Sequence, residues 1–256
     1  MGVFPRRNAK VTMKLFNPIA KYLSRKLGRE VELVISKDFE SFWEGVTEQR
    51  YDLVHYNQYH YLESHKKYGY QVIAKNEEFG SSRISGVITI RVDSGIRSVL
   101  DLKGKKIVFG GGPKAMMSYI VPTYLLREGG LRAGDYEEAF ARNPPNAILS
   151  AYFRQSAAAG AGNIGVKLDV VTRQADVTQL SHLVTSEPLA HLPWAASGRL
   201  DEDLRQKIKA ALIDLKNNGE GLELLKGAKL TGISPATDKD YDPHRKIVKA
   251  VYGKNY

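Results

Sequence analysis

Residues 101–122 read DLKGKKIVFGGGPKAMMSYIVP, and signals for a strand, a turn and a helix follow one another within this stretch. Residues 105–109 form a short apolar run bounded by turn residues, which is typical of a buried strand. The glycines at 110–112 allow left-handed backbone conformations, and Pro113 suits the first turn of a helix that runs to Arg127. Such a turn directs unpaired N–H groups and the positive end of the helix dipole at one point, so the stretch predicts a strand, turn and helix with an anion site.

The glycine turn matches neither of the common nucleotide-binding patterns. It is not followed by the Gly-Lys-Ser/Thr of a P-loop, and it lacks the Gly-x-Gly-x-x-Gly register of dinucleotide sites. The alternative interpretation of residues 110–112 is therefore a tight turn of an α/β domain that binds nothing.

The composition is that of an ordinary globular protein, with 256 residues, 43% hydrophobic and 26% charged. A chain of this length forms one large domain or two small ones. No run approaches the roughly 18 apolar residues of a membrane-spanning helix, so we expect no membrane span. The N-terminus lacks the basic and apolar regions of a signal peptide. We therefore expect either a cytosolic protein or one whose signal segment has been removed.

The chain contains no cysteine and carries a net charge of +10. The lack of cysteine excludes disulfides, thiolate metal sites and cysteine nucleophiles. The charge would suit nucleic acid, but the basic residues are spread along the chain with no run beyond residues 103–106, which is typical of a solvated surface.

His55, His60 and His65 are five residues apart, so each is turned by about 140° from the last on a helix and they cannot share a face as the ligands of one metal. We therefore expect no nucleic-acid partner, no metal and no cofactor.

Catalytic motifs are missing as well. The sequence has neither a Gly-x-Ser-x-Gly elbow nor a His-Glu-x-x-His helix. We therefore expect a protein that is not an enzyme.

Strand and helix signals alternate along the chain. Strand signals lie at residues 3–5, 30–35, 51–56, 70–74, 84–92, 177–184 and 193–196, and helix signals at residues 10–27, 38–49, 201–217, 220–226 and 242–252. Pro18 is expected to kink or restart the first helix, with Asn17 as a possible cap. The alternation predicts an α/β protein with a parallel or mixed sheet covered on both faces. Two such units, near residues 1–88 and 89–188, predict two lobes with a cleft between them.

Tyrosines gather in one part of the chain, where six of the fourteen fall between residues 51 and 70. A tyrosine offers an apolar face and one hydroxyl, which suits the wall of a cleft around a polar ligand. Tyr56 and Tyr59, expected at a strand end and in a first helical turn, are the candidates for such a wall. The other four are expected to fill core and surface.

The chain resembles the type II periplasmic solute-binding proteins, and within that class the phosphonate-, phosphite- and phosphate-binding components of ABC importers. The resemblance covers nearly the whole chain. It is carried by residues 2–5 (GVFP), 52–56 (DLVHY), 93–104 (DSGIRSVLDLKG), 109–113 (FGGGP) and 119–122 (YIVP).

The resemblance implies two α/β lobes joined by two crossing segments, residues 1–88 plus 189–256 and residues 89–188, with the ligand in a cleft between them. It implies a monomeric protein that is periplasmic or tethered to the cell surface, with its signal segment absent from this chain. This protein would capture a phosphonate, phosphite or related oxyanion for the permease of an ABC importer. The alternative is a ligand-sensing domain of the same fold that serves a signalling partner.

The resemblance also implies where the ligand lies. In the family the phosphoryl oxygens are held at the N-terminus of the helix expected to begin here at Pro113, and the cleft tyrosine corresponds to Tyr56. A Ser-Thr-Ser-like run that phosphonate-binding members usually carry is Ala-Met-Met at residues 115–117 here. Ile84 replaces another cleft tyrosine and Ala157 an aspartate. A histidine expected near residues 143–146 is also missing.

Other groups are therefore expected to hold the oxyanion. Backbone N–H groups at 115–117, the hydroxyl of Ser118 and nearby cationic side chains are suitable, because the planar fork of arginine fits tetrahedral oxyanions. Met116 and Met117 would give the pocket an apolar side and favour an organic substituent over bare phosphate. The predicted ligand-binding residues are Phe4, Arg6, Arg7, Tyr56, Tyr59, Arg83, Lys114, Ala115, Met116, Met117, Ser118 and Asn146.

Overall fold

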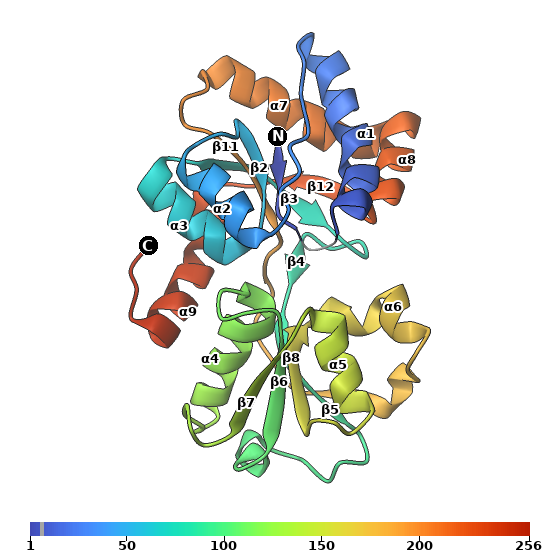
Figure 1. The fold of residues 1–256 in the computed structure, drawn as a ribbon, viewed down its shortest axis with the longest axis vertical. Coiled ribbons are helices and arrows are strands. Elements are labelled where there is room, and N and C mark those ends of the chain that lie inside the picture. The colour runs from blue at the N-terminus through green and yellow to red at the C-terminus, as the bar shows by residue number, and fades with distance from the viewer. Residues whose placement is uncertain (6–7) are drawn as a thin grey trace. The chain divides into compact units, whose positions relative to one another are not determined.

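The computed structural model describes residues 1–5 and 8–256 (Figure 1). The chain divides into two compact units. The first unit contains residues 1–83, 190–243 and 256, and the second contains residues 84–189 and 244–255. This division differs from the expected one at residues 84–88, 189 and 244–255, which all group with the second unit.

The first unit is built on a five-stranded mixed sheet with the strand order β1-β2-β11-β3-β12. Strands β1 and β2 are parallel, β11 is antiparallel to both of its neighbours, and β12 is antiparallel to β3. The strands are β1 (Gly2–Val3), β2 (Leu53–His55), β3 (Gln71–Glu77), β11 (Pro193–Ala196) and β12 (Gly232–Pro235). The helices are α1 (Ala9–Leu27), α2 (Phe39–Thr47), α3 (Gln58–Tyr68), α7 (Glu202–Asp214) and α8 (Gly219–Ala228), with 3-10 turns at Leu215–Asn217 and Asp238–Tyr241.

Helix α1 runs unbroken through Pro18. Its N-cap is Asn8, whose Oδ1 accepts a hydrogen bond of 2.9 Å from the Val11 N–H. The expectation that Asn17 caps a restarted helix was therefore wrong. Apolar side chains at Phe16, Ile19 and Leu23 recur at helical spacing and join the core of the first unit, which is what a buried stripe on an amphipathic helix requires.

The second unit is built on a five-stranded sheet with the order β7-β6-β8-β5-β9. Strand β6 runs parallel to β7 and β8, whereas β5 is antiparallel to β8 and β9. The strands are β5 (Gly86–Arg91), β6 (Lys106–Gly110), β7 (Glu137–Ala141), β8 (Ala158–Gly162) and β9 (Leu180–Thr185). The helices are α4 (Val121–Glu128), α5 (Pro144–Tyr152), α6 (Asp169–Thr172) and α9 (Asp242–Tyr252), which belongs to this unit from residue 244.

Shorter elements complete the chain. A π-helix spans Met116–Ile120 and leads directly into α4. The 3-10 turns of this part lie at Val99–Leu102, Asn163–Lys167 and Val177–Gln179, and strands β4 (Arg83–Ile84) and β10 (Leu189–Ala190) form a two-stranded sheet.

Strand β8 has the sequence AAGAG and is completely buried. A Cβ atom placed on Gly160 would lie 2.4 Å from Phe109 Cδ1 and 2.8 Å from the carbonyl oxygen of Ser118. Neighbouring elements therefore pack closely against this small-residue segment. Glycine is required here because β6 and the π-helix fill the space that a side chain at position 160 would need.

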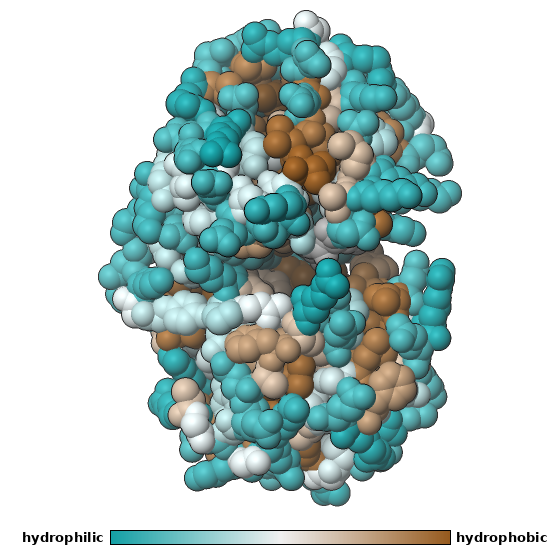
Figure 2. All heavy atoms as spheres, in the orientation of Figure 1, coloured by the Kyte–Doolittle hydropathy of each residue, from teal (hydrophilic) through white to brown (hydrophobic). Residues whose placement is uncertain are grey.

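Hydrophilic side chains cover most of the molecular face in Figure 2, with smaller apolar areas between them. Exposed apolar side chains in the second unit include Leu100, Phe140 and Phe153. Among the described residues, no helix is long and apolar enough to cross a membrane.

Candidate ligand-binding site

The glycine turn of the second unit follows the carboxyl end of β6. Gly110 packs so closely against α5 that a Cβ atom on it would lie 2.2 Å from Pro144 Cα. Gly111 has a φ of +96°, a conformation that residues with side chains rarely adopt, and its N–H donates to the Ala141 carbonyl of β7 at 2.8 Å. Two of the three glycines are therefore fixed by the fold itself, one by close packing and one by backbone conformation.

The helix after this turn begins at Met116 and not at Pro113, so the predicted start was three residues early. Its first turn is a π-helix in which the Val121 N–H donates to the carbonyl of Met116. Pro122 explains the wide turn, because its ring has no N–H to donate and would clash with the carbonyl four residues earlier.

The first residues of this helix carry N–H groups that have no acceptor within the helix. These are the N–H groups of Met116, Met117 and Ser118, because the N–H of Ala115 already donates to the Gly112 carbonyl at 2.9 Å. The residues of the turn before them, Gly112, Pro113 and Lys114, are all exposed. This end of the helix therefore has the donors and the dipole direction that suit an anion.

The side chains of this first turn point into the second unit. Met116 is 1% exposed and Met117 is 8% exposed. The Ser118 hydroxyl is buried and donates a short hydrogen bond to the Gly110 carbonyl. The structure thus uses these side chains to pack the helix and to hold the turn, and leaves the backbone as the source of donors.

Helix α5 also begins beside the glycine turn, but it contributes few donors. Its first two residues, Pro144 and Pro145, have no N–H, and the Asn146 N–H donates to the Oδ1 of the N-cap residue Asn143 at 3.0 Å. The side chain of Asn146 is exposed.

The C-terminal helix α9 contacts both the glycine turn and α4. The hydroxyl of Tyr252 donates a short hydrogen bond to the Pro113 carbonyl. Arg127 of α4 donates through Nη1 to the carbonyls of Ala250 at 2.8 Å and Val251 at 2.9 Å. This role of Tyr252 has no signal in the sequence, because no local pattern reports a contact with a turn 139 residues away.

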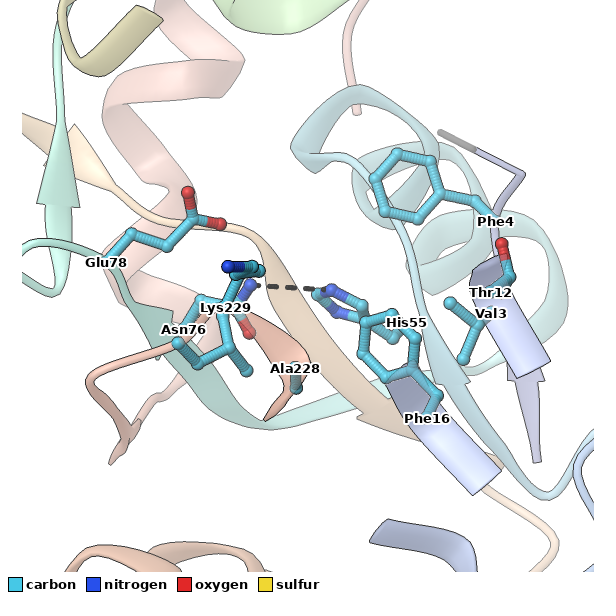
Figure 3. A pocket seen from close by; sticks show the side chains of 10 residues that line it. Val3, Phe4, Thr12, Phe16, His55, Asn76, Glu78, Ala228 and Lys229 are labelled. Atoms are coloured by element: carbon cyan, nitrogen blue, oxygen red, sulfur yellow. Dashed lines mark hydrogen bonds between the residues drawn. The ribbon is translucent and has the colours of Figure 1, made fainter. Parts of the chain in front are cut away.

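The first unit has a small pocket of about 20 Å³, which is room for roughly one water molecule. Figure 3 shows Asn76, Glu78 and Lys229 on one side of it, Phe4 and Thr12 on the other, and His55 between them. Phe4 and His55 lie at the carboxyl ends of β1 and β2, and the Phe4 ring meets the His55 ring edge to face at 5.6 Å. The complete lining is Val3, Phe4, Thr12, Phe16, His55, Asn76, Glu78, Ala228, Lys229 and Leu230.

A buried hydrogen-bond network orients His55 in this pocket (Figure 3). Its Nδ1 lies 3.0 Å from the Pro193 carbonyl and therefore carries the proton, so Nε2 accepts from Asn76 Nδ2 at 3.4 Å. Asn76 Oδ1 in turn accepts from the Trp194 indole N–H at 2.8 Å, and the Trp194 ring stacks on His55 at 4.4 Å. Asn76 and Trp194 were not among the predicted site residues. The signal that was available is an asparagine in a strand, two residues after the apolar run at 72–74.

Tyr56 and Tyr59 are buried in the first unit, at 0% and 1% exposure. The Tyr56 hydroxyl donates to Ser64 Oγ at 2.6 Å, because Ser64 itself donates to the Tyr61 carbonyl. The Tyr59 hydroxyl lies 3.0 Å from that of Tyr256. Burial raises the pKa of both phenols above the ordinary value, so both are neutral. In this structure the two hydroxyls are engaged with other side chains of the same unit.

The remaining predicted residues are cationic. Arg6 and Arg7 lie outside the described residues. Arg83 and Lys114 are exposed. The structure thus brings Lys114, Ala115, Met116, Met117 and Ser118 together around one turn of the second unit, and places Phe4, Tyr56 and Tyr59 in the first unit.

The two α/β units, with their mixed sheets and the glycine turn after a parallel strand, have the type II periplasmic-binding-protein fold. Known structures of this class superpose on the chain. PhnD1 of Prochlorococcus marinus in complex with methylphosphonate has a TM-score of 0.80 at 16% identity, covering 97% of this chain and 96% of that one. The binding protein component of an ABC phosphonate transporter from Pseudomonas aeruginosa has a TM-score of 0.78 at 16% identity, covering 96% and 83%.

The sequence relationship is more specific. Residues 1–241 match the family model described as "ABC transporter, phosphonate, periplasmic substrate-binding protein". The chain is also 23% identical to the phosphate-import protein PhnD of Mycolicibacterium smegmatis, over 96% of this chain and 84% of that protein. The chain therefore belongs to the family of periplasmic substrate-binding proteins of phosphonate ABC transporters.

Membership of this family confirms several predictions from the sequence. The protein is an extracytoplasmic substrate-binding component of an ABC transporter and not an enzyme. It has a small-molecule ligand and a transporter permease as its partners.

Proposed function

We propose that this chain binds a phosphonate or phosphite, and that the N–H groups of Met116, Met117 and Ser118 hold its phosphoryl oxygens. The observation that carries the proposal is the start of the helix after the glycine turn. Three N–H groups without acceptors in the helix lie there beside exposed backbone, at the positive end of the helix dipole. The relative crystallised with methylphosphonate supports this ligand class.

The side chains around this turn have different roles in the proposal. Lys114 is exposed next to the helix start and supplies a positive charge to the anion. Ser118 acts indirectly, because its hydroxyl holds the carbonyl of Gly110 and so fixes the turn. The methionine side chains are buried, so the preference for an organic substituent does not come from them. Phe4, at the carboxyl end of β1, is the contact residue proposed for the first unit.

We further propose that the protein works as a monomer, without nucleic acid, either free in the periplasm or tethered to the cell surface. The separation of the basic residues along the sequence supports a solvated surface over a nucleic-acid footprint.

The proposal is tested by thermal unfolding and calorimetry with phosphate, phosphite, methylphosphonate, 2-aminoethylphosphonate and sulfate. A ligand present at 100 times its Kd stabilises the folded state by about 2.7 kcal/mol. We expect a clear shift with methylphosphonate or phosphite and none with sulfate. Lys114→Gln should weaken that binding about tenfold or more, since a hydrogen bond to a charged group contributes about 1.5–3 kcal/mol. The matched control is Lys103→Gln, which removes an exposed lysine before the amino end of β6. The absence of a shift with every phosphorus oxyanion would contradict the proposal.

A further inference from the structure

An open groove of about 420 Å³ lies in the second unit, at the end of β6 opposite the glycine turn. Ten residues line it: four are cationic, three are uncharged and polar, and three are apolar. They are Arg91, Lys105, Lys106 and Arg154; Ser94, Gln155 and Ser156; and Ile96, Ala151 and Ala157. The cationic residues come from three separate parts of the chain, which the sheet brings together at the end of β5, the start of β6 and the end of α5.

One carboxylate holds the two arginines of the groove. Arg91 donates to both oxygens of Asp93 through Nε and Nη2, each at 2.8 Å. Arg154 donates through Nη2 to Oδ2 of the same carboxylate at 2.7 Å. Arg91 is further fixed by the Tyr152 carbonyl and by Gln179. Asp93 therefore neutralises only one of two guanidinium groups. Lys105 adds a further positive charge, whereas the charge of Lys106 is partly offset by Glu137, whose Oε1 lies 3.8 Å from Lys106 Nζ.

Arg154 occupies a backbone position that ordinarily favours glycine. Its φ is +58°, and it follows Phe153, the C-cap residue of α5, in a C-terminal capping motif. In that motif the Arg154 N–H donates to the Ala151 carbonyl and the Gln155 N–H to the Ser150 carbonyl. Glycine is the usual residue at this place because it has no Cβ to strain the left-handed conformation. An arginine here adopts a less favourable backbone conformation, and its guanidinium lines the groove. Its side chain is 60% exposed.

We propose that this groove is a second anion site, which binds a soluble phosphate ester or another multiply charged phosphate compound. Its volume lies within the range of about 300–1,000 Å³ that is usual for small-molecule sites, and the fork of an arginine fits phosphate oxygens. Strand β6 separates the groove from the glycine turn by five residues, or roughly 17 Å. The groove is therefore independent of the phosphonate site proposed above, and its ligand binds without competing with a phosphonate.

The experiment uses pyrophosphate as the probe, titrated calorimetrically with methylphosphonate present in excess throughout. We expect one pyrophosphate to bind per chain. Arg154→Gly should weaken its binding at least fivefold while the unfolding temperature stays equal or rises, since glycine suits the capping position. Lys105→Gln should weaken it as well. Arg173→Gln, an exposed arginine outside the groove, should bind as the unchanged protein does.

The proposal would be overturned by wild-type affinity in both groove variants, by an equal loss of affinity in Arg173→Gln, or by displacement of pyrophosphate by methylphosphonate. Binding to phosphatidylglycerol vesicles without any binding of pyrophosphate would also overturn it, in favour of a lipid surface. The phosphonate proposal is judged separately by the shift with methylphosphonate alone, so failure of one leaves the other measurable.

Discussion

At the scale of the residue, Ser118 shows how position decides the use of a hydroxyl. It stands in the first helical turn, where a serine could face a bound oxyanion. Its Oγ instead donates to the Gly110 carbonyl and is 4% exposed with the rest of its side chain. A buried carbonyl without a hydrogen-bond partner costs about 1–3 kcal/mol. The hydrogen bond from Ser118 therefore stabilises the packing of β6 against the helix.

Asp93 gives a residue-scale prediction about pH. Hydrogen bonds from Arg91, together with the charge of Arg154, lower the pKa of its carboxyl to about 2, compared with about 3.9 in an unfolded chain. Because the folded pKa is the lower one, the stabilisation is complete above about pH 4 and is lost as the pH falls through about 2. Asp93→Asn should therefore unfold at a lower temperature than the unchanged protein at pH 7. This difference in unfolding temperature should disappear as the pH falls from 4 to 2.

The same prediction can be checked directly by ¹³C NMR of the carboxyl carbon. A titration midpoint near pH 4 would show that Asp93 does not make its contacts with Arg91 and Arg154. The carboxylate is 46% exposed, so solvent screens the pair and the gap in unfolding temperature should be small.

At the scale of the element, the second unit depends on the close approach of β8, β6 and the π-helix. Met116–Ile120 is wound as a π-helix because Pro122 cannot donate to the turn before it. The wider turn carries the Ser118 carbonyl to within 2.8 Å of where a Cβ on Gly160 would stand. The helix that presents the proposed donors therefore lies directly on strand β8 at Gly160.

Gly160→Ala tests this packing. The added methyl group would meet Phe109 and the Ser118 carbonyl, and neither can move without shifting β6 or the π-helix. We expect the free energy of unfolding to fall by about 1–3 kcal/mol, measured by urea denaturation, and affinity for the phosphonate to fall with it. The matched control is Gly219→Ala at the start of α8, where a Cβ meets nothing within 4 Å. Equal stability of the two variants would show that the approach is looser than described.

At the scale of the whole molecule, the C-terminal helix joins a unit that is distant in sequence. Helix α9 follows residues of the first unit, yet residues 244–255 group with the second. Arg127 contributes to this attachment, since its guanidinium donates to two carbonyls at the last turn of α9. A cation at that end also interacts favourably with the helix dipole.

Arg127→Gln should therefore loosen α9. We expect faster hydrogen exchange at the amides of residues 244–252, measured by mass spectrometry, with little change in the sheet of the first unit. Because Tyr252 binds the Pro113 carbonyl, exchange in the glycine turn should rise as well. Arg132→Gln, which removes another exposed arginine, is the control. Unchanged protection of α9 in Arg127→Gln would mean that apolar packing alone holds the helix.

The amino-acid sequence by itself determined the α/β class, the strand at 105–109, the glycine turn and the presence of a helix after it, because these depend on local periodicity and on the backbone freedom of glycine. Resemblance to known proteins then indicated the family, which the comparisons confirm. The start of that helix was predicted three residues early, since proline suits a first helical turn, whereas Pro113 here lies in a turn that the Ala115 N–H closes on the Gly112 carbonyl. Only the tertiary structure decided that Met116, Met117 and Ser118 turn inward, that α9 joins the second unit, and that Arg91, Lys105 and Arg154 share one groove. Each of these depends on contacts between residues far apart in the chain, which no local pattern of side chains records.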